Sequence, residues 1–275
     1  MTRFKAAAVQ FTAVPLDTAR NARDIEQHVR RCAEDGAALI VLPELCHTGY
    51  TLTAELARAS DPLPGPAGDL LYALAADLGV TLVTSLAVRT PEQTELRNTG
   101  LIVTPDGIVA SGAKRALWGA ESQVFIPGRP DEQVIADTPV GRVGVAICYE
   151  GGFPEVTRQL ALHGAQIIAM PSAFGAARLH AWKLMTRSRA LENGCHVVAA
   201  NHSGPSAGFD FCGHSTIVDP QGERKALLPA GEGRIVAEID LRAVDEARSA
   251  VPYLRDLYRV ITPNGAPSNR PKTGS

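Results

Sequence analysis

The first forty residues hold two short apolar segments separated by an amphipathic one. Residues 4–11 form the first apolar run and residues 37–42 the second. Between them, Asp17 can cap a helix over residues 18–35, and Gly36 can end it. A helix placed closely between two strands favours parallel pairing of those strands. This order predicts an α/β layer fold.

The same alternation continues along the chain. Two hairpin turns, at residues 105–107 and 219–222, each follow a comparable series of strands and helices, which indicates a weak internal repeat of two packed halves. We expect one domain over residues 1–261 and a flexible or partner-contacting tail over residues 262–275. Expected helices cover about residues 67–78, 154–163 and 176–193, and expected strands cover 80–88, 99–104, 108–113, 133–137, 142–147, 166–170, 195–201, 211–218, 223–228 and 234–239.

Composition excludes several classes of function. A net charge of -2, few aromatic residues and no basic run give no surface for nucleic acid or membrane. No apolar stretch approaches the ~20 residues of a membrane span. The five cysteines are an odd number without the spacing of a disulfide framework, so we expect a reduced, cytoplasmic compartment.

Cys148 ends an apolar, β-branched strand and is followed by Tyr149, a Gly-Gly pair and the Pro154 start of a helix. α/β enzymes present nucleophiles in this way, because the turn exposes the sulfur. The helix N-terminus is then expected to favour the thiolate and later an oxyanion. A buried core cysteine is the alternative on this stretch alone.

Three further ionisable residues follow predicted strands. Glu44 comes after Pro43 at the end of a strand, Lys114 directly follows another, and Glu121 begins the loop after it. Their chemistry fits that of Cys148. A desolvated Glu44 can take the thiol proton and pass it to a leaving amine, and Lys114 with the Tyr149 N–H can stabilise an oxyanion. Glu121 can orient Lys114 or shape the pocket.

These segments resemble the motifs of the nitrilase superfamily, the carbon–nitrogen hydrolases, over about residues 4–260. The resemblance implies Glu44 as general base, Lys114 as transition-state stabiliser, Cys148 as nucleophile and Glu121 as the second family glutamate. It also implies a four-layer αββα sandwich that forms a homodimer or larger homo-oligomer through its outer helices. The matching segments are 42–45, 112–117, 121–128, 148–155, 187–193, 200–201, 213–215 and 218–222.

Two positions depart from the family pattern. Ala113 precedes Lys114 where an arginine is usual, which leaves the lysine but changes its neighbours. Glu150 stands where amidase members commonly carry Asp, and Tyr149 favours amide over nitrile substrates. Candidate substrate-binding or core residues are Tyr50, Trp118, Tyr149, Phe153, Ala173 and Phe174, and Arg178 and Arg187 are candidate cations for a substrate carboxylate.

Rival interpretations remain at this point. A papain-like enzyme requires a histidine beside Cys148, for which His202 and His214 are candidates. The pairs Cys46-His47 and Cys195-His196 lack the spacing of a metal site, and a non-catalytic scaffold is a third class. We expect an amidase that acts on a small-molecule amide without a cofactor or metal. An N-carbamoyl (ureido) amidohydrolase is the first alternative and a nitrilase the second.

Overall fold

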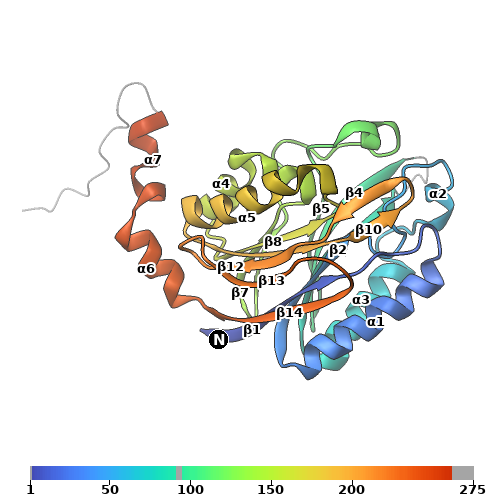
Figure 1. Ribbon diagram of the computed structural model, residues 1–275, viewed down its shortest axis with the longest axis horizontal. Helices are drawn as coiled ribbons and strands as arrows, with labels where there is room; N and C mark the ends of the chain where they lie inside the picture. Colours follow the sequence, from blue (N-terminus) through green and yellow to red (C-terminus); the bar gives the residue numbers. More distant parts are fainter. Residues whose placement is uncertain (1, 91–94, 262–275) are drawn as a thin grey trace, which may run out of the picture.

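Two six-stranded β-sheets pack face to face between two layers of helices (Figure 1). The computed structural model describes residues 2–90 and 95–261. Helices α1 and α3 cover the outer face of the first sheet, and α4 and α5 cover the outer face of the second. The predicted αββα sandwich is therefore confirmed.

The first sheet has the strand order β14-β1-β2-β3-β4-β5. Its last member in the chain, β14, returns from the second half to pair with β1. The elements up to β5 are β1 (Arg3–Gln10), α1 (Thr18–Glu34), β2 (Ala37–Glu44), α2 (Leu56–Ala59), α3 (Pro66–Leu78), β3 (Thr81–Arg89), β4 (Leu96–Thr104) and β5 (Gly107–Ala113).

The second sheet has the order β13-β12-β9-β8-β7-β6, and β10 and β11 form a separate hairpin. The remaining elements are η1 (Gly119–Gln123), β6 (Ile135–Thr138), β7 (Gly141–Val145), η2 (Cys148–Gly152), α4 (Pro154–Leu162), β8 (Ile167–Ser172), η3 (Ala176–Arg178), α5 (Leu179–Asn193), β9 (His196–Asn201), β10 (Ser203–Ser206), β11 (Phe209–Cys212), β12 (Ser215–Val218), β13 (Arg224–Leu228), β14 (Gly233–Asp240), α6 (Arg242–Ala250) and α7 (Tyr253–Ile261).

Strand directions repeat from one sheet to the other. From β14 to β5, neighbours pair antiparallel, parallel, parallel, antiparallel and antiparallel. From β6 to β13 the sequence of directions is the same. The expectation of two pseudo-symmetric halves is thus confirmed, and β2 of one half corresponds to β8 of the other.

The first strand–helix–strand unit forms as its sequence indicates. Asp17 caps α1, since its carboxylate accepts a hydrogen bond from the Arg20 N–H at 3.0 Å. Ile25 and Val29 face the sheet and are buried. The expectation that Pro43 ends β2 is wrong, because the strand continues to Glu44. The missing N–H of proline is tolerated there, since the register with β3 is irregular between Val41 and Glu44.

A second correction concerns residues 203–218. They were expected to contain a loop and then one strand over 211–218, but the chain forms a hairpin, β10 and β11, before β12. The break lies at Gly213 and His214, which both have positive φ, at 61° and 54°. Two successive left-handed residues cannot continue a strand. The hairpin places Phe211 near the ends of β2 and β9, against the ring of His202.

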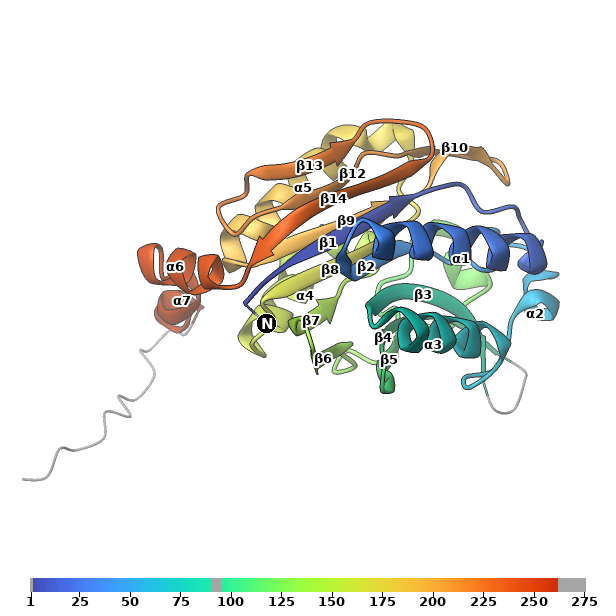
Figure 2. The same ribbon diagram turned by 90° about the horizontal axis from the view of Figure 1, so that it is seen from below.

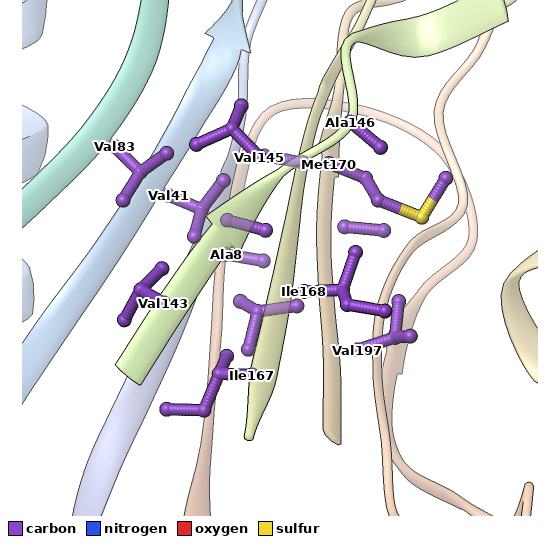
Figure 3. Packing of buried hydrophobic residues seen from close by; sticks show 14 of the residues in the cluster. Ala8, Val41, Val83, Val143, Val145, Ala146, Ile167, Ile168, Met170 and Val197 are labelled. Atoms are coloured by element: carbon purple, nitrogen blue, oxygen red, sulfur yellow. The ribbon is translucent and has the colours of Figure 1, made fainter. Parts of the chain in front are cut away.

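The core lies between the sheets. Val41 and Val83 from the first sheet and Val143 and Ile167 from the second belong to one cluster of buried side chains (Figure 3). A second cluster fills the space between the first sheet and helices α1 and α3. Strand burial on both faces explains why these strands read as continuous apolar runs.

Helices α6 and α7 extend away from the sandwich (Figure 2). None of the residues of α7 is buried, and Tyr258, Val260 and Ile261 are all exposed. The predicted tail, residues 262–275, lies outside the described residues. Within residues 2–90 and 95–261, no helix combines the length and the apolar character needed to cross a membrane.

Candidate active site

The four ionisable residues singled out from the sequence lie at one end of the paired sheets. Glu44 is the last residue of β2, and Lys114 directly follows β5. Glu121 lies in the short helix η1, and Cys148 is the first residue of η2, just after β7. The first three come from one half of the molecule and the cysteine from the other.

Lys114 joins the two carboxylates. Its Nζ donates to Glu44 Oε1 at 2.7 Å and to Glu121 Oε1 at 2.8 Å. None of the three side chains is exposed. Ion pairs in such surroundings need further hydrogen bonds to offset the loss of hydration, and both carboxylates have them.

Glu44 is held on both oxygens. Its Oε1 also accepts from Asn98 Nδ2 at 2.7 Å, and its Oε2 accepts from the Ala173 N–H at 3.0 Å. Asn98 lies on β4 and Ala173 follows β8, so the carboxylate is bound by both sheets. Ala173 was expected near the substrate, and its contact in the structure is with Glu44.

Glu121 has a similar set of donors. The Tyr50 hydroxyl donates to its Oε1 at 2.8 Å, and the Trp118 N–H donates to its Oε2 at 2.8 Å. Tyr50 was expected to line a substrate pocket. It is only 3% exposed, and its hydroxyl contacts Glu121 instead. Its contact supports the view that Glu121 orients Lys114.

Charges in this cluster shift one another's protonation. Burial alone would lower the pKa of Lys114, but the charges of Glu44, Cys148 and Glu121 outweigh it and raise that pKa. Burial, followed by the charge of Glu44, raises the pKa of Glu121, although Lys114 opposes this. Lys114 is therefore a permanent cation, and the Glu121 carboxyl is more basic than an exposed one.

Cys148 is a strained and buried residue. Its φ is 46°, in the left-handed region that side chains other than glycine rarely adopt, and it is 5% exposed. Burial, with Glu44 and Glu121, raises its pKa well above the usual value, although Lys114 and the Ala173 N–H lower it. Burial therefore opposes the thiolate that the helix N-terminus is expected to favour, and a protonated sulfur needs a base.

Two residues hold the turn that carries Cys148. Glu150 accepts from the Ile147 N–H at 2.9 Å and from the Arg115 N–H at 2.8 Å, which links the cysteine turn to the chain beside Lys114. Arg189 on α5 donates to the carbonyls of Gly151 and Gly152. The sequence drew attention to Glu150 and to the Arg189 segment, but not to these contacts.

A cavity of about 440 Å³ adjoins the turn. Of the expected pocket residues, Tyr149 and Phe174 line it. Phe153 is 38% exposed and packs edge-on against Tyr149. The lining contains two cations and no carboxylate, and its members are Tyr149, Gly152, Phe174, Arg178, Ala181, Leu184, Met185, Ser188 and Arg189.

Arg178 and Arg187 differ in their surroundings. The Arg178 guanidinium lies over the rings of Trp118 and Phe174, at 4.6 and 4.7 Å from their centroids. Arg187 instead donates to the Gly222 carbonyl and pairs with Glu223 on the outer surface. Only Arg178 of these two lines the cavity.

The rival sites have other contacts. Both nitrogens of His202 face main-chain carbonyls, and His214 Nδ1 faces the Cys212 carbonyl, so neither histidine is directed at Cys148. Cys195 donates to the Ala165 carbonyl. Across residues 2–90 and 95–261, no three His, Cys, Asp or Glu side chains are grouped so as to hold a metal ion.

Asn201 was noted in the sequence only as part of a motif. Its Oδ1 accepts from the Phe174 N–H at 2.7 Å, and its Nδ2 donates to the carbonyls of Phe174 and Gly213. It thereby fixes the main chain next to Ala173. Asn98 gave no sequence signal at all, since a lone asparagine within a strand has many explanations.

Comparisons with known proteins identify relatives of this chain. The family model described as carbon-nitrogen hydrolase matches residues 5–249. An omega-amidase of Xenopus laevis is 32% identical over 94% of this chain and 98% of its own. A Saccharomyces cerevisiae member of branch 10 of the nitrilase superfamily superposes with a TM-score of 0.84 at 29% identity, covering 91% and 95% of the two chains.

A third relative shows the cysteine in reaction. It is a mutant amidase from Nesterenkonia sp. in which acrylamide has added to the active-site cysteine. It superposes with a TM-score of 0.79 at 29% identity, covering 90% of this chain and 98% of its own.

Proposed function

This chain belongs to the carbon–nitrogen hydrolase family, and we propose that it is an amidase that converts a small carboxamide to a carboxylic acid and ammonia through a Cys148 thioester. The buried contact of Lys114 with Glu44, beside the Cys148 turn, is the observation that carries the proposal. It supplies a base, a cation and a nucleophile in one dry cluster.

In the first half of the reaction, Glu44 takes the proton of Cys148 as the sulfur attacks the amide carbon. This transfer is needed because burial raises the pKa of the Cys148 thiol and so favours the protonated sulfur. The carbonyl oxygen becomes an oxyanion, which the Lys114 ammonium and the Tyr149 N–H stabilise. Glu44 then gives the proton to the departing nitrogen, and ammonia leaves.

In the second half, water replaces ammonia. Glu44 removes a proton from that water as it attacks the thioester carbon, and the carbon–sulfur bond breaks. The proton returns to the sulfur, and the acid leaves. Glu121 stays bound to Lys114 and Tyr50 throughout and keeps the ammonium directed at the reacting oxygen.

Ammonia release from a panel of simple amides, carbamoyl amino acids and nitriles tests this function. We expect the wild type to hydrolyse amides and Cys148→Ala to release no ammonia above background. Cys32→Ala is a matched control, since Cys32 is equally a buried free thiol but lies on α1. Undiminished turnover by Cys148→Ala would disprove the mechanism.

We further propose that the substrate carries a carboxylate at the end remote from its amide. Arg178 supports this, because it lines the cavity, its guanidinium lies over the rings of Trp118 and Phe174, and no acceptor for it is found among the described residues. Half-amides of dicarboxylic acids fit this requirement. N-carbamoyl amino acids fit it as well, which keeps the ureido alternative in the panel.

Arg178→Gln tests the carboxylate contact. A charge-assisted hydrogen bond contributes about 1.5–3 kcal/mol, so kcat/KM for succinamic acid should fall roughly 10- to 100-fold. Turnover of neutral butyramide should remain within about 3-fold. Arg187→Gln, nine residues later on α5 and paired with Glu223, should change neither. An equal loss for both substrates would refute the carboxylate contact.

We propose a homodimer as the assembly. Leu184 and Leu191 on α5 are 69% and 50% exposed, and Leu162 on α4 is 42% exposed, so the outer helical layer offers an apolar face for a second copy. All five cysteines are free thiols, which supports a reducing compartment such as the cytoplasm. Sedimentation velocity at several concentrations tests the dimer.

A further inference from the structure

His202 is a buried histidine that the mechanism above does not use. It follows β9 in the second half, yet its side chain reaches the first sheet. Its Nε2 lies 2.7 Å from the main-chain oxygen of Glu44, and its Nδ1 lies 3.0 Å from that of Phe11. The residue is 1% exposed.

The protonation of the ring determines which contact is a hydrogen bond. Burial lowers the pKa of His202 to about 4, although the two carbonyls oppose this, so the ring is neutral near pH 7. A neutral imidazole carries one N–H. We assign it to Nε2, because the contact with Glu44 is the shorter of the two. Nδ1 then carries no proton, so its contact with the Phe11 carbonyl oxygen is not a hydrogen bond.

The Glu44 carbonyl belongs to the peptide bond that precedes a strained residue. The next residue, Leu45, has a φ of 52°, a conformation that is unfavourable for a side chain other than glycine. This turn directs the chain out of β2 immediately after the base. The Leu45 N–H donates to the carbonyl and to the hydroxyl of Ser85. The Glu44 carbonyl oxygen is the other polar atom of the same peptide bond.

We propose that His202 is a positioning residue for Glu44: it donates to the main chain of the general base and holds the strained Glu44–Leu45 turn in place. The carboxylate must meet Lys114, Asn98 and the Ala173 N–H together, which requires a fixed backbone. Because His202 belongs to the other half of the chain, its bond also sets Glu44 relative to Cys148. This inference rests on the proposed role of Glu44 as base.

Two substitutions separate the two ring contacts. The amide nitrogen of Gln occupies nearly the position of imidazole Nε2, whereas that of Asn reaches only as far as Nδ1. His202→Gln should therefore keep the donor for Glu44, with kcat within about 3-fold of wild type. His202→Asn should lose it, with kcat lowered roughly 10- to 100-fold and KM changed by less than about 3-fold, because a displaced base slows chemistry rather than binding.

His196 provides the matched control. It lies at the opposite end of β9, is 3% exposed, and its Nε2 faces the Asp240 carbonyl at 3.0 Å. His196→Asn removes a comparable buried contact away from the cluster. We expect its melting temperature to fall about as much as that of His202→Asn, while its kcat stays within about 2-fold of wild type.

A second measurement does not depend on the substrate. Alkylation of Cys148 by iodoacetamide, followed by intact mass at pH 7, needs a base for the thiol proton. The rate should fall in His202→Asn and not in His202→Gln or His196→Asn. If the wild type hydrolyses no amide, the proposed function fails, while alkylation still tests His202.

Three results would overturn the positioning role. They are equal kcat in the Asn and Gln variants, a loss in His196→Asn as large as in His202→Asn, and an unchanged alkylation rate in His202→Asn. If His202→Asn does not fold, the Gln variant decides, because it must then be both folded and active.

Discussion

Lys114 is the single cation in a buried group with Glu44 and Glu121. Its removal leaves two carboxylates without a counter-charge, which usually costs about 3–5 kcal/mol. We expect Lys114→Met to lose stability of that order in urea denaturation and to lose amide turnover. Adding Glu121→Gln should restore part of the stability and none of the activity, because one buried charge is then gone but the oxyanion still has no cation.

That comparison has a clear opposite outcome. If the double variant is less stable than Lys114→Met, the two carboxylates do not repel one another across the cluster, and Glu121 has another structural role. The measurement is made at pH 7, and the free energies of unfolding come from linear extrapolation.

The residues of the cluster were open to sequence reasoning to different degrees. Glu44, Lys114 and Cys148 each follow a recognisable strand, so their convergence was predicted from the topology. The contacts of Asn98 and Ala173 with Glu44 span 54 and 129 residues and have no local signal. The need of Cys148 for a base was predicted from its chemistry, and its burial was considered as the alternative to a catalytic role.

The loop from Glu121 to Gly128 is the element that brings Glu121 to Lys114. The Phe125 N–H donates to the Glu121 carbonyl, and the Gly128 N–H donates to the Lys114 carbonyl. A side chain at Gly128 would place its Cβ 2.2 Å from the Ala113 carbonyl oxygen. Glycine is therefore required for close approach of the two backbones, although its φ is not left-handed.

Gly128→Ala should displace this loop. Backbone atoms cannot yield as a flexible side chain can, so we expect about 2–4 kcal/mol lower stability and at least a 10-fold loss of kcat. Gly175→Ala is the control for stability, since its Cβ would make only an ordinary contact at 3.7 Å. Native-like stability and activity of Gly128→Ala would show that the loop can shift freely.

Elements with strong local signals were predicted well, and those without were missed. Helix α1 has a capping residue and an apolar stripe, and its observed bounds differ from the expected ones by one residue. Strand β10 contains Gly204 and Pro205 and alternates poorly, so it read as a loop. The charged helix α6 buries only Val244 and was not among the expected helices.

Buried thiols make the whole molecule sensitive to alkali. Burial raises the pKa of Cys32, Cys46 and Cys212 to about 12 from the ordinary value of 9.0. Between these values the unfolded chain releases thiol protons that the folded chain keeps, so stability is complete below pH 9 and falls as pH rises towards 12. Each thiol contributes a slope of about 1.4 kcal/mol per pH unit.

The free energy of unfolding of the wild type and Cys32→Ala, measured from pH 8 to 11, tests this slope. We expect the variant to be less stable at pH 8, because it leaves a small cavity, but to lose stability less steeply above pH 9. Parallel lines for the two proteins would mean that Cys32 ionises in the folded state as readily as in the unfolded one.

The return of β14 to the edge of β1 affects how the chain can be synthesised. Residues 3–10 are translated before the rest of both sheets, but their antiparallel neighbour, residues 233–240, is translated more than two hundred positions later. Throughout that interval the outer edge of β1 has no strand to pair with, and open edges are where nascent chains associate wrongly. The last strand therefore closes the molecule, and nascent chains depend on protection of that edge until it arrives.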